Sequence, residues 1–452
     1  MPSNKKMFIT RDKSFYKNLI TLTAPIALQN LVSFLMTLTN SIMIGQLGED
    51  ATAAAYAGTL TFTVLQMLAT GVDSGITVSS SRCWGDGDTA KIKSILACGI
   101  YLSLGFGIPI TAISLIHPNA LVSLFLSGGG TASGGEYLRF LALSFIPFVL
   151  SGAIGSCLRS IESPKITTIA SASAFVVNLI FGYLLVFGKL GFTKHGLIGA
   201  AIATTIARIA ELAIVLIYIL FIDKKLKARL CDLFYTNARS MAEFLKYTAP
   251  IVLAQAVWIV NTLFSSYLIS KVGTDSAVAA LAVANTLNSL SYILMNGLSG
   301  AVGIIIGKTI GEGRVEKIKE YAYTTQLIFI VLGAITAAAL LIARQPFVSL
   351  YDIGNEASKI AIQLISVLSL TIVGTSYQSA CLIGLVKSGG DVSFILKNDS
   401  FFIFLVVIPL SITAARLGAP LWLIFLALKS DQILKCIPAA IKINRFRWIK
   451  KL

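Results

Sequence analysis

The sequence predicts an all-α integral membrane protein in which twelve transmembrane helices form two pseudo-symmetric six-helix lobes. Three observations lead to this fold class: an apolar composition, a series of apolar segments of span length, and an internal repeat. Of the 452 residues, 56% are hydrophobic and 13% are charged, and the mean hydropathy is +0.81. Because soluble domains carry about 25% charged residues, a chain this apolar could not cover a water-exposed surface.

Twelve segments are long and apolar enough to cross a membrane, since a helix needs about 20 apolar residues to span the hydrocarbon core. They cover approximately residues 18–45, 52–81, 94–116, 138–158, 166–188, 196–221, 247–270, 276–307, 321–343, 360–386, 397–415 and 417–441. Period-two alternation is absent, which argues against an outer-membrane barrel. The first span is too long for a signal peptide and no small-residue cleavage site follows it, so we expect it to be retained.

The positive charges are distributed unequally between the two ends of these spans. Of the 37 Lys and Arg residues, 28, counting Lys435 with the tail, fall on the side of the two termini, six on the opposite side and three in or beside spans. Positive residues concentrate in cytoplasmic loops, which predicts cytoplasmic termini in the plasma (inner) membrane. The same asymmetry accounts for the net charge of +16, so we expect no nucleic-acid partner.

The chain divides into two halves that resemble each other. We expect an N-terminal lobe over residues 1–221, a cytoplasmic linker over 222–246, a C-terminal lobe over 247–441 and a basic cytoplasmic tail over 442–452. Four segments recur in the same order: 23–28 at 248–253, 44–55 at 269–280, 85–93 at 311–319, and 158–165 at 386–393. Because each half has six spans, both repeats begin on the same side and are parallel. Two such lobes around a polar cleft suit alternating access and favour a transporter over an ion channel.

Ordered motifs extend through both halves: Pro25, Gly45-Gln46-Leu47-Gly48, Trp84-Gly85, Leu158-Arg159-Ser160, Asn178, Tyr183, Gly199-Ala200-Ala201, Pro250, Lys387-Ser388-Gly389-Gly390-Asp391 and Asp399. In their order and spacing they resemble those of the multidrug and toxic compound extrusion (MATE) transporters, over nearly the whole chain. The resemblance implies a V-shaped pair of six-helix bundles. It also implies antiport, in which an amphipathic or cationic organic compound leaves while Na+ or H+ enters.

Several positions at which many members of that family carry an acid are neutral here. Helix 1 has Asn40, helix 7 has Gln255, and helix 5 has Gly182 one turn after Asn178. A neutral amide can ligate Na+ through its carbonyl oxygen, but it cannot release a proton. The predicted cation-coupling residues are Asp73, Asn40, Asn178, Gln255 and Asp399.

Ionisable residues inside the spans are few, and each costs about 2.5–3.5 kcal/mol on insertion scales. Asp73 in helix 2 is either a coupling site, a solvated residue on the cleft wall, or the partner of an arginine. Arg208 and Glu211 are spaced i, i+3, which predicts a structural ion pair on one face of helix 6. Asp399 either binds a cation or pairs with Lys397 or a loop lysine. A separate hypothesis pairs Asp399 with Lys429 as a gate in the second lobe.

Neutral polar side chains supply the predicted substrate cavity. Asn285, Asn288, Tyr292 and Asn296 form one stripe at helical spacing along helix 8. A polar stripe that faces lipid is costly, so this stripe faces either the cleft or another helix. With residues from helices 5, 6 and 10, the predicted cavity residues are Tyr183, Thr204, Asn285, Asn288, Tyr292, Asn296 and Gln378.

These observations predict a secondary active antiporter that exports amphipathic or cationic organic compounds in exchange for Na+ or H+. A flippase for a lipid-linked sugar or lipid of a related family is the alternative, but it would need a basic cleft, and few Lys or Arg lie inside spans. Because no metalloprotease, serine-hydrolase or phosphate-loop motif is present, we expect no enzyme, no cofactor and no metal beyond Na+. The expected partners are the organic substrate and membrane lipid, and the expected state is a monomer.

Overall fold

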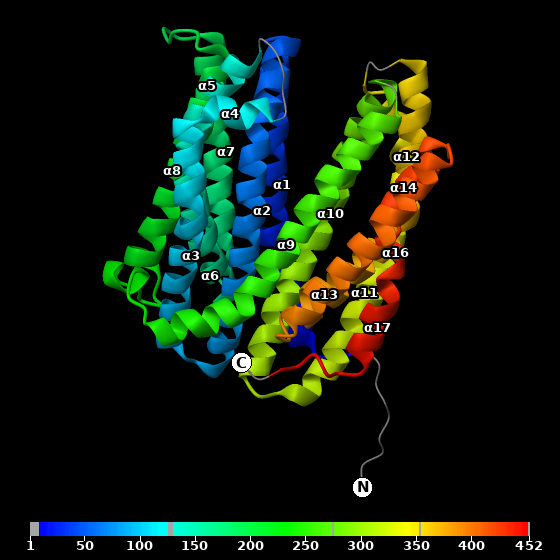
Figure 1. Cartoon of the computed structure of the whole chain (residues 1–452). Helices are drawn as coiled ribbons and strands as arrows, with labels where there is room; N and C mark the ends of the chain where they lie inside the picture. Colours follow the sequence, from blue (N-terminus) through cyan, green and yellow to red (C-terminus); the bar gives the residue numbers. More distant parts are fainter. Residues whose placement is uncertain (1–8, 125–129, 274, 352–353, 451–452) are drawn as a thin grey trace. The chain divides into compact units, whose positions relative to one another are not determined.

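The structure, a computed structural model, describes residues 9–124, 130–273, 275–351 and 354–450. Every regular element in these residues is a helix, apart from one isolated bridge between Gly390 and Ile449 (Figure 1). The predicted all-α class is therefore confirmed. The last two residues of the predicted basic tail, 442–452, lie outside the described residues.

The helices follow the predicted spans closely. In the first half they are α1 (Lys13–Gly45), α2 (Glu49–Asp86), α3 (Thr89–Ile116), α4 (Pro118–Ser123), α5 (Gly130–Ala142), α6 (Phe145–Ser160), α7 (Pro164–Phe187), α8 (Gly196–Ile217), η1 (Tyr218–Ile222) and η2 (Leu230–Leu233). In the second half they are α9 (Ala238–Val272), α10 (Asp275–Gly311), α11 (Val315–Val348), α12 (Asn355–Gln378), η3 (Ser379–Val386), α13 (Val392–Phe402), η4 (Ile403–Val407), α14 (Ile408–Arg416), α15 (Leu421–Leu428), α16 (Asp431–Leu434) and α17 (Cys436–Asn444).

Most of these helices can cross a membrane. Among the described residues, nine helical segments are long and apolar enough, and α5 with α6 form a tenth that is bent by 43°. The long helix α2 and the consecutive short helices α15, α16 and α17 coincide with the two remaining predicted spans. The chain is therefore an integral, multi-pass membrane protein, and the described residues include helices in all twelve predicted spans.

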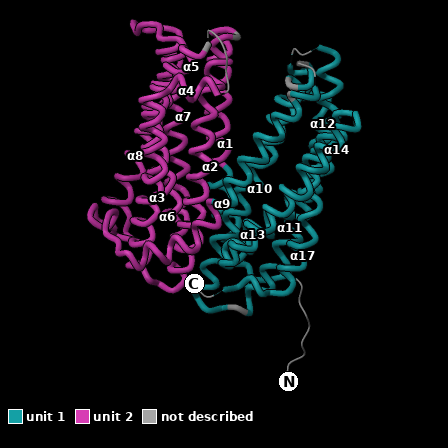
Figure 2. The backbone as a smooth tube through the Cα atoms, viewed as in Figure 1, with its two compact units in different colours: residues 1–27, 253–452 teal, residues 28–252 magenta. Residues whose placement is uncertain are grey.

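The chain forms two compact units, which Figure 2 shows in different colours. Unit 1 comprises residues 1–27 and 253–452, and unit 2 comprises residues 28–252. The boundaries fall inside α1 and α9, each two residues after the helix-interior prolines Pro25 and Pro250. The first parts of α1 and α9 thus belong to the opposite units from those expected for lobes at 1–221 and 247–441, which follow the sequence repeat.

Matched turns show that the two halves repeat in structure as well as in sequence. Gly87 ends α2 with φ +77°, and Gly313, at the equivalent position after α10, has φ +71°. Glu162 and Gly390 form a second equivalent pair, with φ of +56° and +83°. After each of the four residues, the next amide donates to a carbonyl five positions earlier, at 2.9–3.3 Å. Glycine adopts this left-handed conformation at little cost, which explains why both repeats keep it at the first pair.

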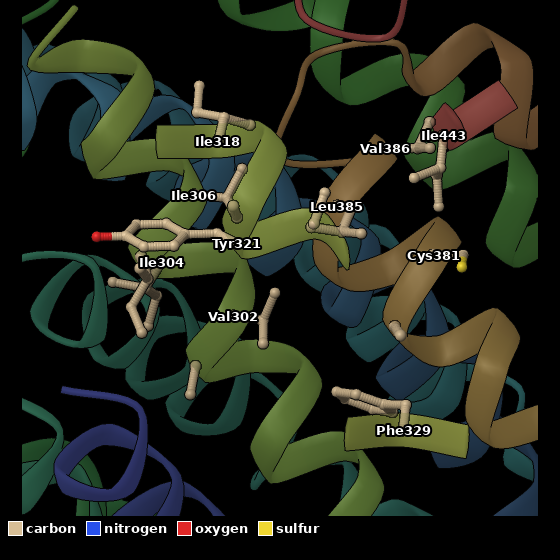
Figure 3. Packing of buried hydrophobic residues seen from close by; sticks show 14 of the residues in the cluster. Val302, Ile304, Ile306, Ile318, Tyr321, Phe329, Cys381, Leu385, Val386 and Ile443 are labelled. Carbon is tan, nitrogen blue, oxygen red and sulfur yellow. The ribbon is translucent and has the colours of Figure 1, made fainter. Parts of the chain in front are cut away.

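Apolar packing holds each unit together. Figure 3 shows part of the core of unit 1, where Val302 of α10, Phe329 of α11 and Leu385 of η3 pack together. On the outside, α11 exposes Ile335 and Ile342 at 62% and 78%. Exposed apolar side chains of this size are unfavourable in water but suit a helix that faces hydrocarbon.

Residues near the first and last described positions contact other parts of unit 1. Asp12, just before α1, accepts hydrogen bonds from the Lys317 ammonium at 2.8 Å and the Tyr321 hydroxyl at 2.9 Å. These bonds lower the pKa of Asp12 to about 2. At the other end, Lys450 forms an ion pair with Asp391. The partners of Asp12 at the start of α11 and the partner of Lys450 just before α13 lie on the same predicted side of the membrane. An even number of spans is expected to leave both termini on one side.

Candidate functional site

A cluster of neutral polar side chains joins α1, α7 and α8 in unit 2. The Nδ2 atoms of Asn40 and Asn178 each lie 3.3 Å from the hydroxyl oxygen of Thr204, which itself donates to the Ala200 carbonyl at 2.9 Å. Asn178 is buried, and its Oδ1 atom has no hydrogen-bond partner among the described residues. The cluster offers amide and hydroxyl oxygens, which can ligate a hard cation, but it holds no group that exchanges a proton near neutral pH.

Gly182, one turn after Asn178 on α7, lies close to α1. A Cβ atom at Gly182 would lie 3.0 Å from the sulfur of Met43 on α1. A carboxylate at this position would therefore require the Met43 side chain to shift.

The carboxylate of Asp73 on α2 faces an arginine that the predicted span 138–158 leaves outside the membrane. Arg159 lies in the last turn of α6 and interacts electrostatically with both Asp73 and Glu211. It donates to Ser156 Oγ at 2.7 Å and to Gln29 Oε1 at 3.3 Å. Of the three interpretations of Asp73, its electrostatic interaction with Arg159 favours the partner of an arginine.

The network continues from Arg159 to the ion pair on α8. Nη1 of Arg208 lies 2.7 Å from Oε2 of Glu211, three positions later in the same helix. Ser171 donates to the other Glu211 oxygen at 2.7 Å and accepts from Gln29 at 3.3 Å. Because Gln29 also binds Arg159, hydrogen bonds and charges link five helices, and two acids balance two arginines.

A second charged cluster lies inside unit 1 and centres on Lys435. Its ammonium nitrogen lies 2.9 Å from Asp399 Oδ1 and 3.0 Å from Asp431 Oδ2, and 5.1 Å from the ring centroid of Trp258. The Lys435 side chain is 0% exposed, that of Asp399 is 7% exposed and that of Asp431 is 2% exposed. The predicted pair of Asp399 with Lys429 is therefore wrong, and Lys435 is a buried residue instead of part of the cytoplasmic tail.

Gln378 of α12 supports the interrupted helix that carries this cluster. Its Nε2 atom lies 2.9 Å from the carbonyl oxygen of Asp431 and 2.6 Å from that of Gln432. The Gln432 amide in turn lies 3.4 Å from the hydroxyl of Tyr292 on α10. Gln378 and Tyr292, both predicted to line a cavity, thus bind groups of the protein itself.

The remaining predicted residues differ in their exposure. On α10, Asn285 and Asn296 are exposed, whereas Asn288 is partly buried. Tyr183 of α7 is 50% exposed, and Gln255 of α9 is partly buried. The polar stripe of α10 is therefore divided, because some of its members contact other helices and others are open.

Two residues that organise these clusters were missed by sequence reasoning, although spacing signals were present. Arg159 directly follows a predicted span and stands three positions after Ser156, on the same helical face. Lys435 stands four positions after Asp431, the spacing that brings opposite charges together on a helix.

Comparison with known families matches both halves of the chain. The family model named MatE matches residues 25–184 and again residues 250–413. The chain belongs to the MatE family. The two matched segments begin at Pro25 and Pro250, in agreement with the internal repeat.

Two bacterial proteins are among the relatives to which this MatE chain is similar. A probable multidrug resistance protein NorM of Bradyrhizobium diazoefficiens is 25% identical over 363 residues, which cover 79% of this chain and 76% of the relative. A second probable NorM, of Thermotoga maritima, is 22% identical over 373 residues and covers 81% and 80%.

Solved structures share the fold. A crystal structure of MATE in complex with MaL6 has a TM-score of 0.85 at 19% identity and covers 95% of this chain and 97% of its own. A MOP superfamily transporter from Pyrococcus furiosus, described as having a binding pocket of reverse polarity, has a TM-score of 0.87 at 19% identity and covers 98% and 100%. At these identities the structures support the two-lobe fold.

Proposed function

We propose that this protein is a secondary active antiporter that exports amphipathic or cationic organic compounds in exchange for Na+ or H+ by alternating access. The observation that carries the proposal is the match of the transporter family to both halves of the chain, 25–184 and 250–413. The multidrug resistance names of the relatives support the substrate class.

The coupling ion is proposed to bind at polar groups inside the spans. Asn40 and Asn178 form a neutral cluster suited to Na+, with Gln255 as a further amide. Asp73 interacts electrostatically with Arg159, Asp399 pairs with Lys435, and either carboxylate is suited to H+ or Na+.

The remaining expectations belong to the same proposal. We assign Arg208 and Glu211 a structural role, and the two lobes to residues 1–221 and 247–441. The protein is proposed to act as a monomer in the inner membrane, with cytoplasmic termini and lipid around its outer helices. Substrate contacts are proposed at Tyr183, Thr204, Asn285, Asn288, Tyr292, Asn296 and Gln378.

A flippase for a lipid-linked sugar fits the charges less well. Such a cargo carries a pyrophosphate, which requires basic side chains available to it. Arg208 and Lys435 are each held by carboxylates at 2.7–3.0 Å, so their charges are already balanced.

Transport by purified protein in proteoliposomes tests the proposal. Accumulation of ethidium is measured with an imposed Na+ gradient, an imposed pH gradient, or neither. We expect at least one of the two ion gradients to drive ethidium transport in the direction opposite to ion flow. This transport should stop when an ionophore collapses that gradient. Ethidium transport that is the same with and without each gradient would exclude antiport. Protein-free vesicles control for leakage.

A further inference from the structure

The charged cluster of unit 1 carries an imbalance that the cluster of unit 2 does not. Two carboxylates, from Asp399 and Asp431, share the single ammonium of Lys435 at 2.9 and 3.0 Å. With all three groups ionised, the cluster would hold one net negative charge in a nearly inaccessible position. A net charge inside the hydrocarbon region costs several kcal/mol, so the cluster favours one additional positive charge.

The neighbouring groups include one further cation, which lies beyond ion-pair distance of both carboxylates. Tyr292, Cys436 and Lys429 are the titratable groups that face Asp431 from α10, α17 and the end of α15. Tyrosine and cysteine contribute no positive charge. The Lys429 ammonium lies 5.6 Å from the ring centroid of Phe425, and no described carboxylate lies within 4 Å of it. Its attraction to Asp431 therefore acts at longer range than the contacts of Lys435.

The lysine between the carboxylates favours a proton over a metal ion as the additional charge. A metal cation requires several oxygen ligands and would lie beside a fixed ammonium that repels it. The nearby carbonyl oxygens of Asp431 and Gln432 already accept hydrogen bonds from Gln378. A proton needs one carboxylate oxygen alone, and its arrival weakens one of the two ion pairs with Lys435.

The backbone around the cluster is interrupted on both elements that carry it. The π-helical turn η4 follows the Asp399 helix α13 directly, and the twelfth span breaks at Lys429–Ser430 and again at Lys435. A Cβ atom at Gly374 of α12 would clash with the Gln432 carbonyl oxygen, so α12 packs directly against the break. Irregular backbone at membrane depth is costly and concentrates at functional sites of transporters.

We propose that Asp399, Asp431 and Lys435 form a proton-binding site, at which one proton shared by the two carboxylates drives export of the organic compound. The proton comes from water on one side of the membrane, binds one carboxylate oxygen, and leaves from the pair to water on the other side. This inference rests on the proposed antiport. It adds the identity of the ion, and it adds Asp431 and Lys435 to the site.

The fluorescence of Trp258 provides a test that does not depend on transport. Its indole contacts both Asp399 and Lys435, so a proton gained or lost there changes its surroundings. We expect a pH transition in the emission of the full-length protein that Trp258→Phe removes. Asp399→Asn and Asp431→Asn should each displace it by about one pH unit or more.

Asp391→Asn is the matched control, because Asp391 pairs with two lysines outside the spans. It should leave the transition unchanged. An unchanged transition in both cluster variants would overturn the proposal. The wild-type protein supplies a further measurement should the variants not fold: its transition should fall at the same pH in NaCl and in choline chloride. A midpoint that follows the Na+ concentration would overturn the assignment to a proton.

Transport separates this inference from the proposed function. We expect a pH gradient to drive ethidium export in the wild type and in Asp391→Asn, and the drive to fall at least about tenfold in Asp399→Asn and Asp431→Asn. Coupled export that both cluster variants retain would overturn the proton site and leave antiport intact. The opposite result is also informative. A Trp258 transition that Asp399→Asn and Asp431→Asn displace as expected, together with no coupled export by the wild type, would overturn antiport and leave the proton-binding site intact.

Discussion

The buried ion pair of α8 allows a prediction whose size follows from the structure. Glu211→Gln removes the charge that Arg208 contacts at 2.7 Å, while a glutamine can still bind Ser171. The two side chains of the pair are only 15% and 9% exposed, so water cannot replace the lost carboxylate easily. Removal of one partner from a buried ion pair costs about 3–5 kcal/mol.

Two features reduce the expected loss below that range. The guanidinium of Arg208 lies 5.0 Å from the ring centroid of Phe148, a contact that the variant keeps. The retained hydrogen bond to Ser171 avoids an unsatisfied donor. We therefore expect Glu211→Gln to lower the free energy of unfolding by about 2–3 kcal/mol.

An exposed pair of the same residue types supplies the control. Arg239 and Glu243 lie 3.2 Å apart on α9, with side chains 89% and 59% exposed. Glu243→Gln should cost at most about 0.5 kcal/mol. Thermal unfolding of both variants in detergent, followed by tryptophan fluorescence, measures the difference. Equal midpoints for Glu211→Gln and Glu243→Gln would refute the argument that burial sets the strength of this pair.

Two further predictions concern unit 1: the close contact of α12 with Gln432, and the ion pair of Asp12 with Lys317. Gly374→Ala should lower the unfolding free energy by about 1–3 kcal/mol, because the new methyl group meets the Gln432 carbonyl oxygen. The control Gly105→Ala, with open space around the new methyl group, should be neutral or slightly stabilising. Similar unfolding midpoints for the two variants would contradict the close contact of α12 with Gln432. Asp12→Asn should cost about 1 kcal/mol at pH 6, allowing for solvent, since the Lys317 bond holds the pKa of Asp12 near 2. Because the pKa of Asp12 is lower in the folded than in the unfolded state, the ionised carboxylate stabilises the fold above about pH 4, and this stabilisation is lost as the pH falls toward about 2. The difference in thermal stability between wild type and Asp12→Asn should therefore disappear across that range. A difference that stays constant would refute the prediction.

Sequence patterns were sufficient where the structure is set by local chemistry. The left-handed turns at Gly87 and Gly313 end equivalent helices because glycine is found there in both halves, and their positions follow from the repeat. The pair of Arg208 with Glu211 follows from spacing on one helix.

Contacts between helices far apart in the sequence could not be predicted in the same way. Nothing in the neighbourhood of Asn40 indicates that Thr204, 164 positions away, lies within 3.3 Å. Arg159 was placed outside the membrane because the apolar segment of the sequence ends at Leu158. The helix α6 nevertheless continues through Arg159 to Ser160. Lys435 was assigned to the tail by its charge, and only tertiary packing shows that two carboxylates make its burial possible.

Exchange without an imposed gradient tests the central claim most directly. Proteoliposomes that contain this MatE protein are loaded with ethidium and diluted into ethidium-free buffer, while internal indicators record pH and Na+. Antiport predicts that ethidium efflux carries H+ or Na+ into the vesicles, and that the ion movement stops when ethidium is omitted. Ethidium efflux with neither ion entering, or with an ion leaving alongside it, would contradict the account.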